Sequence, residues 1–299
     1  MLDGLLDRLK ALDVEIIENY PLSRISAVRI GGNARLLLRP RSISSLAEVV
    51  QMLCDGGLKY KIVGRMTNIL PPDAEYDGVV ISTSALTGYS IVGTTLLAEC
   101  GLCLGTVIDK LVRVGLGGFE ELSCIPGSIG GMITMNAGAF GKEISDILLS
   151  VDVYSPSDRR RYSLSASDLG MAYRSSTVRK NGLAVLSATL KLTAKDSNDI
   201  SDCIGRFREE RLRAQPCTLP SLGSTFKRPS IGYASKMIDE CGLRGFRLGG
   251  AEVSEKHAGF IVNRGGATAE QFKALITLCR ESVAEKFGVV LEPEIEILD

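Results

Sequence analysis

The chain has 299 residues, of which 45% are hydrophobic and 23% are charged. This composition is typical of a globular protein longer than one ordinary domain, so two or three substructures are expected. The 35 basic and 35 acidic side chains cancel, which argues against nucleic acid or an anionic membrane surface as the main partner. No segment approaches the ~20 apolar residues of a membrane span, and the amino terminus lacks the apolar core of a signal peptide.

The cysteines and the histidine limit the chemistry further. Eight cysteines are irregularly spaced, and His257 is the one histidine. In an intracellular protein, such cysteines are typically small buried hydrophobes or free thiols. Cys100-x-x-Cys103 has no second pair and no nearby histidine, so neither a zinc site nor a redox pair is favoured. We therefore expect a cytoplasmic protein without a bound metal.

The first half of the chain is predicted to alternate helices with strands. The predicted elements are a helix over residues 2–12, strands over residues 28–30, 34–38, 60–63 and 79–82, and helices over residues 45–55 and 106–114. Ser45 is expected to begin its helix in a capping box with Glu48, because the two side chains can satisfy each other's backbone N–H groups. Gly56 and Gly57 are expected to end that helix.

The second half is predicted to contain antiparallel strands and then helices. The predicted elements are strands over residues 151–154, 161–164 and 183–192, helices over residues 200–214, 234–240 and 268–287, and a last strand over residues 289–298. Thr268 and Gln271 form the capping pair of the long helix. Alternation along the last strand would put Glu292, Glu294 and Glu296 on one face.

A glycine-rich segment runs from Glu120 to Gly141, with apolar residues interspersed among its glycines. Glycine lets the backbone approach a ligand and adopts positive φ, so the segment is expected to form a poor helix or strand but to wrap a bulky ligand. The backbone N–H groups of four residues are candidates for a pyrophosphate-binding nest. These are Gly127, Ser128, Gly130 and Gly131. The alternative is a turn region without a ligand.

Seven short blocks occur in order along the chain and together indicate a family. They are Arg29-Ile30-Gly31-Gly32, Ile125-Pro126-Gly127-Ser128-Ile129-Gly130-Gly131, Met135-Asn136-Ala137-Gly138-Ala139-Phe140-Gly141, Tyr173-Arg174-x-Ser176, Gly223-Ser224-Thr225-Phe226-Lys227, Ser254-Glu255-Lys256-His257-Ala258-Gly259-Phe260 and Leu291-Glu292-Pro293-Glu294. With them the chain resembles the UDP-N-acetylenolpyruvoylglucosamine reductase family of bacterial peptidoglycan synthesis. The resemblance covers about residues 19–298. No insertion separates the last blocks, as in the shorter of the family's two subtypes.

The resemblance implies an α+β fold and a set of ligands. The expected parts are two subdomains of a vanillyl-alcohol-oxidase (PCMH) type FAD-binding fold, over residues 1–85 and 86–195, and a carboxyl-terminal α/β substrate-binding domain over residues 196–299. The implied cofactors are FAD and NADPH, and the implied substrate is UDP-N-acetylglucosamine enolpyruvate. A monomer with neither nucleic-acid nor membrane partners is expected.

The resemblance also implies which residues hold the FAD pyrophosphate. They are Gly64, Arg65, Met66, Thr67 and Asn68 in the loop after the strand over residues 60–63, and Ile125, Pro126, Gly127, Ser128, Gly130 and Gly131. Two positions depart from the family pattern: Met66 stands where the loop has a glycine, and Cys124 where a glycine usually precedes Ile125. If φ is positive at Met66, the methionine costs about 1 kcal/mol or more.

The implied reaction has two steps: NADPH reduces the flavin, and flavin N5 then gives a hydride to substrate C3. Arg174 matches the family arginine that supports the substrate carboxylate and enolate. The planar guanidinium of arginine suits a planar carboxylate better than lysine would. Ser224 matches the proton donor to C2, and Glu294 matches the glutamate that acts with Arg174. Tyr173 and Lys227 are implied to contact substrate, and Lys227 would polarise Ser224 or bind a substrate phosphate.

Without the resemblance, the same residues would be interpreted as non-catalytic. Ser224 is a loop serine, the three carboxylates of the last strand form a solvated edge, and His257 is structural. Two other functions also stay open. Met66 and Cys124 motivate a flavin-poor or non-enzymatic relative that binds a UDP-sugar. The other is a flavin oxidoreductase of the same fold that acts on a different substrate.

Overall fold

The computed structural model describes residues 2–299, with side chains from Leu6 onward. The chain divides into two compact units. Unit 1 comprises the described residues up to Glu18 together with Leu36–Arg65 and Gly78–Glu209, and unit 2 comprises Asn19–Arg35, Met66–Asp77 and Glu210–Asp299. This division rests on compactness alone. The three-part division at residues 85 and 195 concerns ligand binding and stays a prediction.

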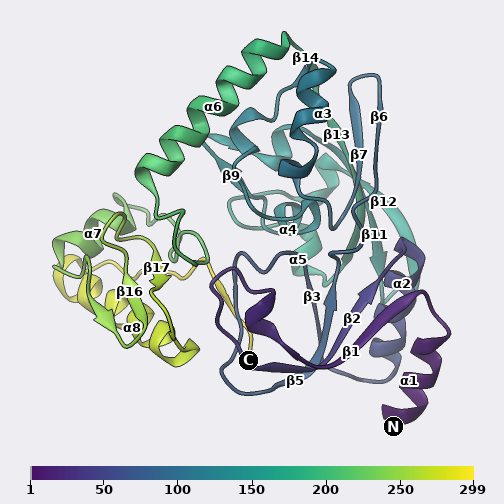
Figure 1. Cartoon of the computed structure of the whole chain (residues 1–299), viewed down its shortest axis with the longest axis horizontal. Coiled ribbons are helices and arrows are strands. Elements are labelled where there is room, and N and C mark those ends of the chain that lie inside the picture. The colour runs from purple at the N-terminus through teal and green to yellow at the C-terminus, as the bar shows by residue number, and fades with distance from the viewer. Residues whose placement is uncertain (1) are drawn as a thin grey trace. The chain divides into compact units, whose positions relative to one another are not determined.

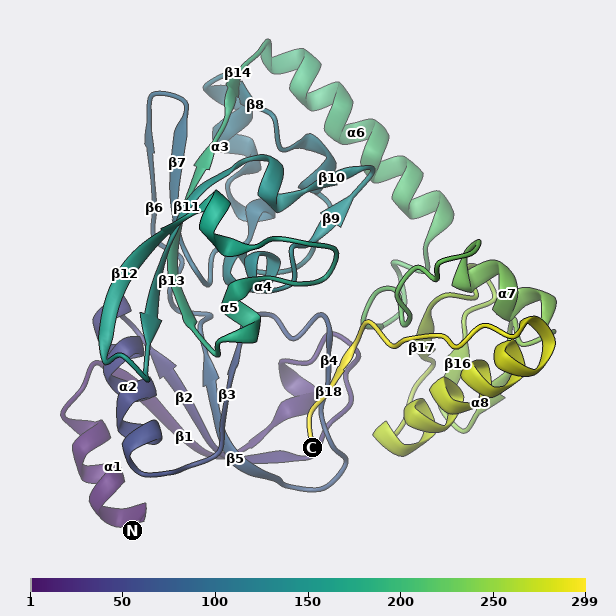
Figure 2. The same cartoon turned by 180° about the vertical axis from the view of Figure 1, so that it is seen from behind.

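A five-stranded antiparallel sheet belongs to unit 1 (Figure 1). In spatial order its strands are β12 (Arg160–Ser165), β11 (Leu148–Ser155), β13 (Ala184–Lys191), β7 (Thr95–Glu99) and β6 (Tyr89–Val92). The three antiparallel strands predicted between residues 151 and 192 are confirmed as β11, β12 and β13. The hairpin of β6 and β7 was not predicted. The helices α2 (Ile43–Asp55) and α4 (Ile129–Thr134) pack on β13 (Figure 2).

A second sheet has four strands in the order β1-β2-β5-β3. They are β1 (Val14–Pro21), β2 (Asn33–Pro40), β5 (Tyr76–Ser82) and β3 (Tyr60–Val63), and β3 and β5 are parallel. Three of the predicted strands are therefore confirmed. The strand predicted over residues 28–30 is wrong: Val28 and Ile30 are buried, but Arg29 between them has φ +57°, which breaks an extended conformation.

The helices of the first 214 residues agree with the predictions in part. They are α1 (Leu2–Lys10), α2, α3 (Ile108–Arg113), α4, α5 (Thr177–Lys180) and α6 (Ser197–Ala214), with 3₁₀ turns at Leu22–Arg24, Leu104–Thr106, Glu120–Leu122, Ile144–Asp146 and Ala166–Leu169. The predicted capping box at Ser45 and Glu48 is wrong. Ser42 caps α2, and Ser45 is its reciprocal partner. Residues 120–141, expected to form a poor helix or strand, contain the six-residue helix α4, which Ser128 caps.

Unit 2 contains two helices and a three-stranded antiparallel sheet. They are α7 (Ala234–Glu240), α8 (Ala269–Phe287), β15 (Arg247–Leu248), β16 (Ala251–Val253) and β17 (Ile261–Asn263). Helix α8 packs against β16 and α7. Both helices were predicted, and the capping box of Thr268 with Gln271 and the end at Gly288 are confirmed.

The last strand, predicted over residues 289–298, is wrong for most of its length. Only β18 (Glu296–Ile297) is a strand, and it pairs in parallel with β4 (Ile69–Leu70). Before it, Pro293 makes a single antiparallel bridge with Phe226. The bridge is made by the N–H groups of Glu294 and Lys227, so it needs no donor from Pro293. The chain then changes partner and joins β4. The remaining two-residue strands are β8 (Leu116–Gly117), β9 (Gly138–Ala139), β10 (Lys142–Glu143) and β14 (Thr193–Ala194).

Each unit has its own apolar core. In unit 1 the buried side chains of α2, such as Val50, pack with sheet residues such as Val151 and Leu190. In unit 2 the inner face of α8, including Phe272 and Leu275, packs with the buried sheet. Within residues 2–299, no helix combines the length and the apolar character that crossing a bilayer requires.

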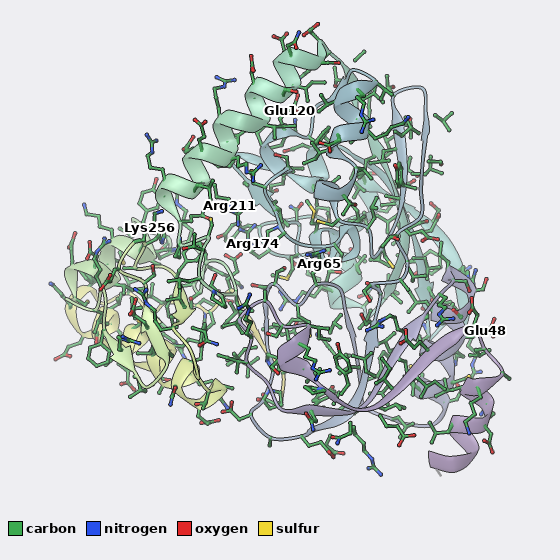
Figure 3. The ribbon with its side chains drawn as sticks, in the orientation of Figure 1. Glu48, Arg65, Glu120, Arg174, Arg211 and Lys256 are labelled. Atoms are coloured by element: carbon green, nitrogen blue, oxygen red, sulfur yellow. The ribbon has the colours of Figure 1, made fainter. Side chains whose placement is uncertain are left out.

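The cap of α2 gives a stability prediction. The Ser45 N–H donates to Ser42 Oγ at 3.0 Å, whereas Glu48 is exposed on α2 (Figure 3). Ser42→Ala is expected to lower the free energy of unfolding by about 1 kcal/mol, and Glu48→Ala to change it by less than about 0.5 kcal/mol. Urea unfolding followed by circular dichroism measures both. Equal losses would argue against Ser42 as the cap.

Candidate active site

The loop after β3 and the start of α4 touch within unit 1. A Cβ atom built on Gly64 would lie 2.1 Å from Ser128 Oγ, so a side chain at position 64 would force that oxygen to move. Ser128 itself is buried, and its Oγ accepts a hydrogen bond from the Gly131 N–H at 3.4 Å. Two segments predicted to hold the same pyrophosphate are therefore in contact, and glycine at position 64 permits that contact.

The expected nest of four free N–H groups is smaller than predicted. The Gly130 N–H donates to the Cys100 carbonyl at 2.8 Å, and the Gly131 N–H is taken by Ser128. Gly127 and Ser128 supply the two amides of this set that make no hydrogen bond within residues 2–299. Neither residues 64–68 nor residues 125–131 include an aspartate or glutamate, and Arg65 adds a positive charge (Figure 3). These residues fit an anionic diphosphate.

Met66 stands where the family pattern has a glycine, and its φ is positive. Its φ is +45°, and its side chain is 2% exposed. The conformation costs about 1 kcal/mol, whereas complete burial of a methionine side chain contributes about 1.5–3 kcal/mol. The burial therefore outweighs the strain. Cys124, the second departure, is partly buried, with its Sγ 3.7 Å from Ser123 Oγ.

Arg174 lies in a tight turn of unit 1 (Figure 3). Ala172 and Ser175 form a two-residue bridge around it, and Arg174 has φ +54°. Its Cζ atom lies 4.8 Å from the ring centroid of Tyr173, which is 48% exposed, in a cation–π arrangement. A non-glycine residue at positive φ is strained, and such strain clusters at functional sites.

Ser224 and Glu294 lie on neighbouring backbone segments of unit 2. The Glu294 N–H donates to the carbonyl of Thr225, and the Lys227 N–H donates to that of Glu292, both at 2.8 Å. This register puts Ser224, which is exposed, at the end of the segment beside Glu294. The ammonium group of Lys227 contacts the Glu292 carboxylate.

Two contacts that position candidate residues, one in each unit, were not predicted. Asn68 Nδ2 donates to the Glu294 carbonyl at 3.1 Å, and the Glu296 N–H donates to the Asn68 carbonyl at 2.9 Å. Asn68 was predicted only as a cofactor residue, but it also holds the backbone of Glu294. In unit 1, Asn136 holds the Arg174 turn through the Ala172 carbonyl. Its place in a glycine-rich block was visible in the sequence, but its partner was not.

Glu120 anchors the beginning of the glycine-rich segment. Its carboxylate is buried and accepts hydrogen bonds from the Gly118 N–H at 2.7 Å and from Lys195 Nζ at 2.8 Å. Burial raises the pKa of Glu120, but the hydrogen bonds from Lys195 and the backbone outweigh it. The pKa of the carboxyl group therefore lies below its ordinary value.

His257 and the cysteines have structural surroundings. His257 Nδ1 accepts from the Gly259 N–H at 3.2 Å, and the ring packs edge-on against Phe260. Burial lowers the pKa of His257. Cys100 and Cys103 are free thiols, and burial raises the pKa of Cys100 to about 12. Residues 2–299 contain no group of three or more histidine, cysteine or acidic side chains that could hold a metal ion.

Comparison with known proteins accounts for both halves of the chain. Residues 34–160 match an FAD binding domain, and residues 215–298 match the C-terminal domain of UDP-N-acetylenolpyruvoylglucosamine reductase. The UDP-N-acetylenolpyruvoylglucosamine reductase of Caldicellulosiruptor bescii is 39% identical over 292 residues, which are 97% of this chain and 93% of that protein. The chain belongs to the UDP-N-acetylenolpyruvoylglucosamine reductase family.

Other members of the reductase family support the same assignment. The Clostridioides difficile enzyme is 39% identical over 296 residues, 99% of this chain and 96% of its own length. The crystal structure of the Thermus caldophilus reductase has a TM-score of 0.81 and 29% identity, and it covers 96% of this chain and 99% of its own. The expected FAD-binding fold with a reductase C-terminal domain is confirmed, as is the resemblance to the shorter type.

Membership of the reductase family establishes the activity class. The protein is a UDP-N-acetylmuramate dehydrogenase of peptidoglycan synthesis that uses FAD and NADPH. This assignment decides against a non-enzymatic relative and against a flavin oxidoreductase with another substrate.

The contact of Gly64 with Ser128 predicts a rescue experiment. Gly64→Ala is expected to lower both flavin content and thermal stability, because its Cβ would overlap Ser128 Oγ. In the Gly64→Ala, Ser128→Ala double variant the nearest remaining Ser128 atom would be Cβ at 3.1 Å. Part of the flavin content should therefore return, which absorbance of the purified proteins measures. A double variant worse than Gly64→Ala alone would contradict the contact.

Glu120 predicts a pH dependence of stability. Because its pKa is lowered on folding, its stabilisation is complete above the ordinary value of 4.5 and is lost as pH falls through the lower value in the folded protein. Glu120→Gln should lower the free energy of unfolding by about 1–3 kcal/mol at pH 7. The difference between the two proteins should shrink below pH ~4.5, as urea titrations at several pH values would show. A constant difference would refute this account.

Proposed function

We propose that Arg174, Ser224 and Glu294 carry the substrate chemistry of this reductase, and that residues 64–68 and 125–131 hold the FAD pyrophosphate. The observation that carries the first part is the backbone pairing of Thr225 with Glu294, which supports a joint action of Ser224 and Glu294. The Gly64–Ser128 contact supports the second part. When bound, FAD supplies the hydride that passes from its N5 to substrate C3.

Hydride addition at C3 leaves negative charge at C2, delocalised into the substrate carboxylate as an enolate. In our proposal Arg174 stabilises this charge, because its planar fork can donate two parallel hydrogen bonds to a carboxylate. A positive group already held in place lowers the barrier most, since it needs no reorganisation as charge develops. The turn and the Tyr173 ring restrict Arg174 in this way.

The enolate must then take a proton at C2, and Ser224 is the proposed donor. A serine hydroxyl is a weak acid, so it donates only to a strongly basic carbon and only from a fixed position. The hydrogen bonds of Thr225 with Gly259 and Glu294 fix the backbone beside it. Glu294 is proposed to act with Arg174 at the enolate.

Tyr173 and Lys227 are the proposed substrate contacts. Tyr173 has an exposed ring beside Arg174. Lys227 is paired with Glu292, and we propose that it contacts a substrate phosphate. The enzyme is further proposed to act as a cytoplasmic monomer, which sedimentation velocity of the holoenzyme and cell fractionation would test.

Ser224→Ala separates the two steps of the reaction. The variant should still be reduced by NADPH at nearly the normal rate, because Ser224 has no part in that step. Turnover with UDP-N-acetylglucosamine enolpyruvate should fall by about 10²–10⁴-fold, the usual contribution of a positioned proton donor. Stopped-flow absorbance of the flavin measures each step. Ser230→Ala, an exposed serine nearby, is the control, and unchanged turnover in Ser224→Ala would exclude the proposed donor.

A further inference from the structure

The segment at the carboxyl end of α4 is joined to the turn that carries Arg174. Ser176 Oγ donates to the Thr134 carbonyl at 2.9 Å, and Arg179 Nη1 lies 3.3 Å from Met135 Sδ. The next residue, Asn136, donates from Nδ2 to the Ala172 carbonyl at 3.3 Å. Three consecutive residues, from the last residue of α4 to Asn136, therefore contact the segment around Arg174. All of them belong to unit 1.

Asn136 is the most buried and most fully bonded member of this group. Its side chain is 1% exposed, and its Nδ2 also donates to Glu143 Oε2 at 2.7 Å. Its Oδ1 accepts from the Ser145 N–H at 3.4 Å. Asn136 has φ +43°, a conformation that asparagine tolerates better than most residues. A carboxamide is suited to this position because it offers two donors and one acceptor on a short side chain.

Arg174 needs such support. It is held at positive φ within a bridge of only two paired residues, Ala172 and Ser175. The carbonyl that Asn136 binds belongs to Ala172, one member of that bridge. A bond at this point fixes the base of the turn, and thus the direction from which the guanidinium leaves it.

We propose that Asn136 is a positioning residue for Arg174. Resting on the proposed role of Arg174, the inference adds that Asn136 makes this arginine effective through the Ala172 carbonyl, while contacting neither substrate nor cofactor itself. Helix α4 thereby joins two functions within unit 1, since its N-cap Ser128 meets Gly64 and its carboxyl end, from Thr134 to Asn136, holds the Arg174 turn.

The test removes the carboxamide without straining the backbone. Asn136→Gly keeps a residue that accepts positive φ. Asn19→Gly is the matched control, because Asn19 also has positive φ (+51°) and uses its side chain in a hydrogen bond, with Asn33. Should Asn136→Gly fail to fold, Asn136→Asp has the same size and tolerates the same φ, but it replaces the Nδ2 donor by an acceptor.

Stopped-flow measurements on the holoenzyme compare flavin reduction by NADPH with flavin reoxidation by UDP-N-acetylglucosamine enolpyruvate. In the Asn136 variant, reoxidation should slow by about 10- to 100-fold, as expected when a catalytic group is misplaced by about 1 Å. Flavin reduction by NADPH should stay within about twofold of normal, and Asn19→Gly should alter neither rate. Equal losses in the two steps would overturn the proposal.

A double-mutant cycle with Arg174→Gln completes the test. If Asn136 acts through Arg174, adding Asn136→Gly to Arg174→Gln should slow reoxidation little beyond Arg174→Gln alone. Independent, multiplying losses would show that Asn136 has a general structural role and would refute the inference. Normal reoxidation in Arg174→Gln would refute the proposed function itself, so the two failures are distinguishable.

Discussion

The contact of Gly64 with Ser128 is the constraint on which the organisation of unit 1 depends. The backbone of Gly64 meets the side chain of Ser128 there, and a methyl group at position 64 would overlap Ser128 Oγ. Ser128 is also the cap of α4, so the contact fixes where this short helix begins. A helix of six residues has little stability of its own. It is held by this contact at one end, by the Arg174 turn at the other, and by β13 along its side.

In unit 2, Ser224 and Glu294 are positioned by backbone pairing and not by a helix. Ser224 lies in a loop and Glu294 in an irregular segment, and neither belongs to a regular element. Hydrogen bonds of Thr225, Lys227 and Asn68 set their register. Pro293 sits at the centre of this pairing, where the neighbouring Glu294 and Lys227 supply the N–H donors. The segment leaves Phe226 after this one bridge and then joins β4.

Local signals predicted the fold where they were sufficient. The capping pair of Thr268 with Gln271 and the apolar face of α8 are contained in nearby residues, and both were predicted correctly. One error was local, because Ser42 and not Ser45 caps α2. Others came from long-range contacts. Apolar Val28 and Ile30 were taken for a strand, although they are buried in a loop. The proposed site residues were identified from family blocks, whereas the proposed role of Asn136 depends on a partner 36 residues away.

Met66 changes what holds the loop after β3 together. A glycine in that position would adopt positive φ without strain, and the loop would owe its shape to the freedom of its backbone. Met66 instead holds the loop by burying its side chain. Apolar burial has a temperature dependence that a strain-free turn lacks, since it weakens on cooling. This loop should therefore become less ordered on cooling, as a small hydrophobic core does.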